Sequence, residues 1–329
     1  MQAQAIASPL VLWLGLSVAA FGQFRDADPQ GPRPGETTVR TWRIGVVVTA
    51  AGPCRGIVAT TSVPTDWPEQ QVRLVAEEAS PGVRVAYEMI DDAGKQPAVR
   101  QMTVRIPSLG AGQTGRGIAT FEVTRTEQRA PEDTAIYVLP DARRPDRTLR
   151  GYLKPGPYIE SSHPRIEALA AQLGAGEARA WDRVEAIYDW VRENVELEDN
   201  RDQGVKTTLE TLRDGTGDCD ELTSLVIAIC RAAGVPARTV RVPGHCYGEF
   251  YLEDDRGRGH WFPYDAARSA PFGEVTEDRP VLQKGDHLRL RDPATKRWRT
   301  YRFLPDHLIV ADLRGAPPQV QVVLEPIDD

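Results

Sequence analysis

The spacing of apolar residues changes along this chain, and that change limits the possible folds more than any other feature. From about Thr38 to Arg125, apolar side chains recur at every second position, as in the run from Trp42 to Val48. From Ser161 to Gly234 they recur at every third or fourth position, and alternating runs return after that. A period of two is typical of half-buried strands, and a period near 3.6 of helices with one buried face. The order predicts an α+β fold.

The alternating half of the chain predicts an antiparallel β-sandwich over residues 38–129. Turn clusters rich in Gly, Pro and Asp separate the strands, and several short alternating strands at this spacing are typical of sandwiches. The expected strands cover residues 42–48, 57–63, 72–76, 83–89, 102–106 and 119–123. No group with catalytic chemistry stands out there, so we expect this domain to support the fold, guide a substrate or contact a partner.

The N-terminus carries a segment of a different kind. Pro9 to Phe21 is uncharged and mostly apolar, and Ala20-Phe21-Gly22 offers a small-x-small cleavage site. This predicts a signal peptide over residues 1–22, because the run is shorter than the roughly 20 apolar residues of a membrane-spanning helix. No Lys or Arg precedes the run, which leaves a mis-assigned start or an uncleaved anchor as alternatives. We expect a periplasmic or secreted protein with no integral membrane span after signal removal.

Other segments complete the predicted organisation. Residues 23–37 are predicted to be a flexible leader rich in Pro and Gly, and 130–157 a connector rich in Pro and Arg. Residues 158–275 form an α+β domain, and 276–329 a C-terminal β extension of hairpins. The helices are expected near 161–174, 177–195, 207–213 and 219–234, and the strands that follow near 237–242, 245–252 and 260–264. The first helix is expected to be capped by Ser161 or Ser162, with Pro164 in its first turn.

Composition excludes some classes of partner and site. The chain of 329 residues has a net charge of −7, which argues against a nucleic-acid surface, because such a surface needs clustered basic residues. The four cysteines, Cys54, Cys219, Cys230 and Cys246, show no disulfide framework, and no C-x-x-C pair suggests a structural zinc site. We therefore expect no metal and no cofactor.

Three residues occur in the order that builds an activated thiol nucleophile. Cys219 opens the most helix-like stretch of the chain, His245 begins a strand-like run, and Asp265 follows an aromatic run. A thiol with a pKa near ~8.5 is mostly protonated at neutral pH, but a helix N-terminus and a nearby imidazole both favour the thiolate. A carboxylate on the far nitrogen orients the imidazole. Adjacent strands would place His245 and Asp265 side by side, facing the start of the helix.

Each of these residues also has an ordinary structural interpretation. A single cysteine is more often a packed thiol than a nucleophile, and Cys230 on an apolar helical face is expected to be buried and inert. Cys246 is a rival thiol, but as the strand neighbour of His245 it should point to the opposite face and be buried. Asp218 and Asp220 would oppose a thiolate, so we expect them to bind helix N–H groups or face solvent. The backbone N–H of Cys219 could donate to an oxyanion, and a second donor is not assigned.

The surrounding motifs give the three residues a context. The turn Thr211–Cys219, the helix end Cys230–Arg238, the strand with His245, the run Trp261–Asp265 and the upstream helix Ile187–Val195 together resemble the transglutaminase-like superfamily. The resemblance covers about residues 160–270. It implies a papain-like catalytic core in the domain at 158–275. There, Cys219 would be the nucleophile, His245 the general base and then acid, and Asp265 the orienting carboxylate.

The chain departs from the family pattern, and these departures limit which properties of the family can be expected of this chain. Cys246 and Tyr247 follow the histidine where the family often has Ala-Trp, and the interval between Cys219 and His245 is short. No acidic calcium-binding cluster is evident, so calcium dependence is not expected. The β-sandwich matches no family that we can name from the sequence.

The resemblance implies an exported, cysteine-dependent acyl-transfer enzyme that acts on peptide or protein amides. A thioester acyl-enzyme would pass its acyl group to water, giving hydrolysis, or to an amine, giving a crosslink. The alternative is a non-catalytic transglutaminase-like binding module in the cell envelope. A third option, arylamine acyl transfer, uses the same residue order but needs an acyl-CoA pocket that the sequence does not reveal.

Overall fold

In a computed structural model of the chain, residues 30–92, 96–141, 146–177, 179–198, 204–292 and 295–327 are described. The predicted signal peptide at 1–22 and the first part of the predicted leader lie outside these residues. The helices are η1 (Leu149–Leu153), α1 (Pro164–Gly174), α2 (Ala180–Asn194), α3 (Thr208–Asp214) and α4 (Cys219–Ala232). The strands are β1 (Arg33–Thr49), β2 (Cys54–Val63), β3 (Gln70–Ala79), β4 (Arg84–Asp91), β5 (Pro97–Leu109), β6 (Thr114–Arg129), β7 (Glu196–Leu197), β8 (Thr216–Gly217), β9 (Ala237–Val242), β10 (His245–Glu253), β11 (Gly259–Tyr264), β12 (Gln283–Lys284), β13 (Leu288–Arg291), β14 (Trp298–Tyr301), β15 (His307–Leu313) and β16 (Gln319–Ile327).

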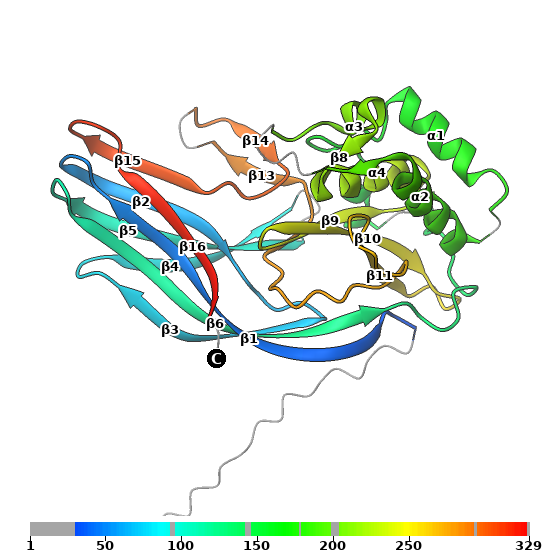
Figure 1. The fold of residues 1–329 in the computed structure, drawn as a ribbon, viewed down its shortest axis with the longest axis horizontal. Helices are drawn as coiled ribbons and strands as arrows, with labels where there is room; N and C mark the ends of the chain where they lie inside the picture. The colour runs from blue at the N-terminus through cyan, green and yellow to red at the C-terminus, as the bar shows by residue number, and fades with distance from the viewer. Residues whose placement is uncertain are drawn as a thin grey trace, which may run out of the picture.

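Long antiparallel strands build one half of the molecule (Figure 1). A four-stranded sheet has the order β16-β1-β6-β3, and it faces β5 and β2 of a second, larger sheet. The inward side chains, among them Ile44, Phe121, Val104 and Ile57, form one buried apolar cluster. All six predicted runs fall in strands except for Val83, which lies one residue before β4, so the prediction of antiparallel strands followed by an α+β half is confirmed. β1 begins at Arg33, before the predicted boundary at residue 38.

The C-terminal residues return to this half of the molecule. β15 pairs with β2. The whole of β16 pairs with the part of β1 from Thr41 to Thr49. The expected hairpin also forms, as β13 and β14. The predicted division at residue 276 therefore separates segments that share the same sheets.

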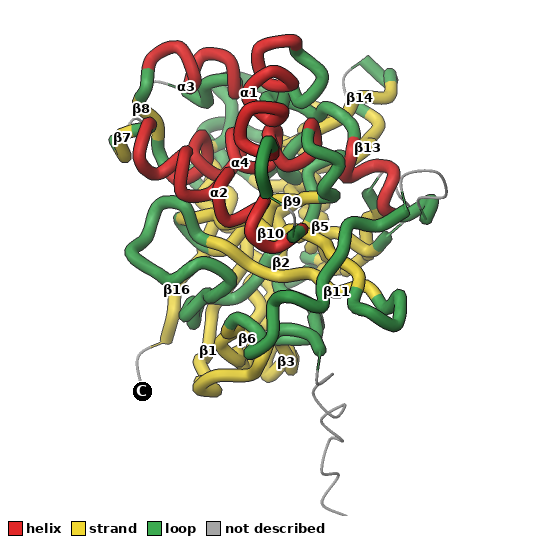
Figure 2. The backbone as a smooth tube through the Cα atoms, turned by 90° about the vertical axis from the view of Figure 1, so that its right-hand side faces the viewer, coloured by secondary structure: helices red, strands yellow, loops and turns green. Residues whose placement is uncertain are grey.

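The other half places helices against one face of the larger sheet. That sheet runs β11-β10-β9-β12-β5-β2-β15, with β4 beside β5, so it extends from the sandwich into the helical half. The helices gather on one side of the strands (Figure 2). α4 lies at the centre, in contact with α1, α2, α3, β9 and β10. Its apolar residues pack with Phe250, Phe262 and Tyr264 of the sheet in a second buried cluster.

Local capping chemistry explains where the helices begin. Thr207 caps α3 and Asp218 caps α4, each in a capping box with the glutamate three residues on. Pro164 occupies the first turn of α1, as predicted. The prediction that Ser161 or Ser162 caps α1 is wrong, because Nδ1 of His163 accepts the hydrogen bond from the Arg165 N–H at 3.2 Å. The imidazole directly before the proline supplies the acceptor that this helix start needs.

A buried network of charges lies where the sandwich meets the helical half. Nζ of Lys284 on β12 lies 2.8 Å from Oε1 of Glu69 and 2.5 Å from Oε1 of Glu249. Arg125 of β6 lies 3.3 Å from Glu69. All four side chains are at most 4% exposed. Such buried charges are tolerated because each has an opposite charge close by.

Replacing Lys284 by Met should destabilise the protein, because Glu69 and Glu249 lose the cation between them and keep one arginine each, Arg125 and Arg238. Loss of one partner of a buried pair costs about 3–5 kcal/mol. Arg73→Met is the matched control, since the Arg73–Glu122 pair lies on the surface and should change stability by less than about 1 kcal/mol. The free energy of unfolding in urea measures both. Equal effects of the two variants would contradict a structural role for the Lys284 network.

Candidate active site

Cys219 is the first residue of α4, and the local sequence holds it there. The Asp218 carboxylate accepts hydrogen bonds from the N–H groups of Asp220 and Glu221, and Glu221 accepts from the N–H of Asp218. Asp218 therefore caps the helix, as predicted. Burial raises the pKa of Asp218 to about 6, with contributions from Glu221 and Cys219. The backbone N–H of Cys246 also bonds to Cys219 and lowers its pKa.

His245 and Asp265 meet at the end of two neighbouring strands. β10 begins at His245, directly after Gly244, whose φ of 68° turns the chain out of β9. β11 ends at Tyr264 and is antiparallel to β10, so Asp265 follows beside His245. Nε2 of His245 lies 2.7 Å from Oδ2 of Asp265, and the two side chains are 9% and 4% exposed. The predicted side-by-side placement is therefore found.

The bond to Asp265 determines which imidazole nitrogen serves the thiol. With Nε2 engaged, Nδ1 is the nitrogen left for the hydrogen bond between His245 and Cys219. Asp265 is itself held in place, because its Oδ1 accepts the Ala267 N–H at 3.1 Å. Behind it, the Tyr188 hydroxyl donates to the carbonyl oxygens of Asp265 and Ala270. Tyr188 lies in the helix predicted near 177–195, and no role in the site was predicted for it from the sequence.

The electrostatics of the site favour an ion pair. Hydrogen bonding from the Cys246 thiol, and then from His245, outweighs burial and lowers the pKa of Cys219 to about 5. Burial opposes a charge on His245, but the bonds to Asp265 and Cys219 raise its pKa to about 9. Between these values Cys219 is a thiolate and His245 an imidazolium. This is the protonation state that a cysteine nucleophile needs.

Cys246 corrects part of the sequence interpretation. It is buried, as predicted, but it does not face away from the site. Its thiol donates to Oδ1 of Asp220 at 2.6 Å and to the backbone carbonyl of Cys219 at 3.5 Å, and it lowers the pKa of Cys219. The reason is that Cys246, Phe250 and Leu252 share the face of β10 that packs against the helices. His245 is the first residue of β10 and interacts with Cys219 from that end of the strand.

The remaining thiols lie away from this chemistry. Cys230 is fully buried in α4, and burial raises its pKa to about 12, as expected for an inert thiol. Cys54 is buried at the start of β2 in the sandwich. All four cysteines are free.

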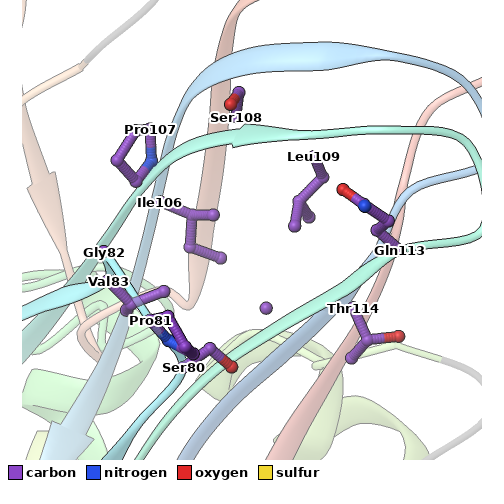
Figure 3. A pocket seen from close by; sticks show the side chains of 11 residues that line it. Ser80, Pro81, Gly82, Val83, Ile106, Pro107, Ser108, Leu109, Gln113 and Thr114 are labelled. Carbon is purple, nitrogen blue, oxygen red and sulfur yellow. The ribbon is translucent and has the colours of Figure 1, made fainter.

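Other features of the described residues offer no competing site. A hollow of 510 Å³ at the end of the sandwich is lined by residues 80–83, 106–109 and 113–115 (Figure 3). None of those side chains can act as an acid, a base or a nucleophile near neutral pH. In the same described ranges, no group of three His, Cys, Asp or Glu side chains is placed to hold a metal ion. No helix there has the length and hydropathy to span a membrane.

The arrangement has the parts of an acyl-transfer centre. It combines a thiolate at a helix start, an imidazolium able to return its proton, and a carboxylate that orients the ring. The sequence predicted all three residues, and the structure brings them together. The sequence-based prediction missed Arg302, a buried arginine that contacts Asp220, because no local pattern in the C-terminal segment distinguishes this arginine.

Comparison with known proteins finds similar solved structures. No curated protein sequence matches the chain. A proposed cysteine protease from Cytophaga hutchinsonii has a similar solved structure, with 18% identity, a TM-score of 0.57, and coverage of 90% of this chain and 93% of that one. The periplasmic domain of TgpA from Pseudomonas aeruginosa matches with 16% identity and a TM-score of 0.33, covering 70% of this chain and 93% of that domain.

The family comparison covers the segment that contains the candidate site. The model of the transglutaminase-like superfamily matches residues 167–266, which include α2, α4 and strands β9 to β11. Cys219, His245 and Asp265 all lie within the match. Residues 167–266 therefore match a transglutaminase-like core, and the similar solved structure shares the fold of most of the chain.

Proposed function

We propose that this protein is an exported enzyme that transfers acyl groups from peptide or protein amides through a thioester on Cys219. The observation that carries the proposal is the Cys219–His245–Asp265 arrangement. Its thiol pKa near 5 and imidazole pKa near 9 bracket neutral pH. The transglutaminase-like core at 167–266 supports the same chemistry. Export is supported by the uncharged apolar run at residues 9–21.

The proposed reaction begins with attack of the Cys219 thiolate on the amide carbon. The carbonyl oxygen becomes an oxyanion, to which the backbone N–H of Cys219 donates a hydrogen bond. His245 gives its proton to the departing amine as the C–N bond breaks, which leaves a thioester on Cys219. Asp265 keeps the imidazole oriented throughout, with its charge opposite the imidazolium.

The acyl group then passes to water or to a second amine. His245, now neutral, removes a proton from the acceptor as it attacks the thioester, and the thiolate leaves. With water the result is hydrolysis or deamidation, and with a primary amine it is a crosslink. The candidate site admits both outcomes, so the acceptor is a matter for experiment.

Cys219→Ala should abolish catalysis and labelling by a thiol-reactive acyl probe, because the other three thiols are buried. Labelling measured by mass spectrometry, with Cys54→Ala as the control, checks this. Undiminished labelling of Cys219→Ala would move the nucleophile to another thiol. A wild-type protein that never reacts would favour the alternative of a non-catalytic binding module.

Activity should follow a bell-shaped dependence on pH. Cys219 must lose its proton, so kcat/KM rises through a midpoint near 5, and His245 must keep its proton, so activity falls through a midpoint near 9. Asp265→Asn removes the bond that raises the His245 pKa and should move the alkaline limb down by about 1–3 pH units. Asp278→Asn, at an exposed pair with Arg40, should leave the profile unchanged. A profile of Asp265→Asn that superimposes on the wild type would count against its orienting role.

The acyl acceptor can be identified directly. A glutamine-containing protein mixture is incubated with the enzyme, with and without a primary amine, and analysed by mass spectrometry. We expect deamidated or cleaved products without the amine, and amine adducts if transamidation competes with water. The same products with Cys219→Ala would show that another protein in the sample made them.

A further inference from the structure

The C-terminal segment contributes a buried cation to the candidate site. Arg302 follows β14, outside the family match at 167–266, and it is 4% exposed. Gln283 of β12 fixes the backbone around it, donating to the Arg302 carbonyl at 2.7 Å and accepting the Leu304 N–H at 2.9 Å. Arg302 is thus held by the strand that joins the two halves of the larger sheet.

Arg302 reaches the thiol through two intermediate groups. Its Nη2 donates to the backbone carbonyl of Asp220 at 3.1 Å and lies 3.5 Å from the Asp220 Oδ1. The same Oδ1 lies 2.6 Å from the Sγ of Cys246. The Cys246 Sγ also lies 3.5 Å from the backbone carbonyl of Cys219, and the thiol lowers the pKa of Cys219. The path from guanidinium to nucleophile is therefore Arg302, Asp220, Cys246 and Cys219.

The Cys246 thiol has one proton and three acceptors nearby. They are the Asp220 carboxylate at 2.6 Å, the Cys219 backbone carbonyl at 3.5 Å and the Cys219 sulfur. A bare carboxylate would be a strong competitor for that proton, because charged acceptors form the stronger hydrogen bonds. A guanidinium beside the carboxylate offsets its charge and leaves the proton available to the thiolate.

The charges around the thiol make this compensation necessary. Asp218, Asp220 and Glu221 lie at the start of α4, and only His245 on β10 faces Cys219 with a positive charge among the described groups in contact with it. Arg302 adds a second cation, with its Nη2 3.5 Å from Oδ1 of Asp220. Acidic groups near a thiolate oppose it, and a nearby cation favours it.

Fold stability does not account for Arg302. Its Nε and Nη1 are buried and have no hydrogen-bond partner among the described residues. The guanidinium packs over the ring of Phe303 at 4.7 Å, which recovers only part of the cost of burying a charge. An arginine retained under these conditions points to a role in the site.

We propose that Arg302 is a positioning residue for the nucleophile, which holds Asp220 so that the Cys246 thiol donates its hydrogen bond to Cys219. The inference rests on the proposed function, since it takes Cys219 as the nucleophile. It adds that the C-terminal segment, and not the family core alone, completes the site.

The pH dependence of Cys219 alkylation by iodoacetamide, measured on the full chain, tests the proposal without any substrate. Arg302→Met should raise the thiol pKa by about one unit, which moves the midpoint of the alkylation profile from near pH 5 to near pH 6 and lowers the rate near pH 6 roughly twofold. Adding Asp220→Asn to Arg302→Met should return the pKa toward the wild-type value, because the competing charge is gone. Arg302→Lys should restore most of the rate, and Arg299→Met on β14, where Arg299 is exposed, should have no effect.

The outcomes separate the two proposals. An unchanged thiol pKa in Arg302→Met, or equal losses in the single and double variants, would overturn the role of Arg302 and leave the proposed function intact. An ordinary thiol pKa in the wild-type protein would overturn both. If Arg302→Met does not fold, Cys246→Ala replaces it. The pKa of Cys219 should then rise because its thiol donor is lost. An unchanged pKa would overturn the proposed path from Arg302 through Asp220 and Cys246 to Cys219.

Discussion

The burial of helix α4 is the constraint on which the rest of the structure depends. Apolar side chains occur on nearly all its faces, and even Thr223 and Ser224 are fully buried. A helix that is apolar all round must be enclosed, so α1, α2 and α3 cover it on one side and β9 and β10 on the other. The capping box at Asp218 fixes where it begins. The enclosure of α4 and its fixed first residue together place Cys219 beside the start of β10, and the chemistry of the site follows from that placement.

Sequence predicted the parts of the molecule that local patterns specify. Alternation gave the six N-terminal strands, and turn and helix-stop residues gave β9, β10 and the end of α4, because these signals lie within the elements themselves. The three candidate site residues were found for a similar reason, since each lies in a short motif. The face of β10 that carries Cys246 could not be assigned, because alternation says that neighbours oppose each other but not which face meets the helices. The cap of α1 was missed because an imidazole took the place of a hydroxyl.

Contacts between distant segments lay beyond the reach of local patterns. β16 pairs with β1 although most of the chain separates them in the sequence, and the same is true of β15 and β2. Nothing in 307–327 marks these strands as edges of the sandwich rather than as a separate extension. The same limit applies to Arg302, the residue for which we propose a role in the site. One arginine among many in an arginine-rich chain carries no signal, and its meaning appears only when the C-terminal segment is placed beside α4.

Strand β12 shows how the two halves are joined with only two residues. It pairs with β5 of the sandwich and with β9 of the core. Successive residues of a strand point to opposite faces, and here each face has its own task. Lys284 neutralises Glu69 and Glu249 at the junction, while Gln283 binds the backbone on both sides of Phe303 and so fixes Arg302. The residue that stabilises the junction and the residue that supports the site are thus neighbours. A shift of the sandwich against the core would therefore disturb the surroundings of Cys219, even though no sandwich residue touches the thiol directly among the contacts described.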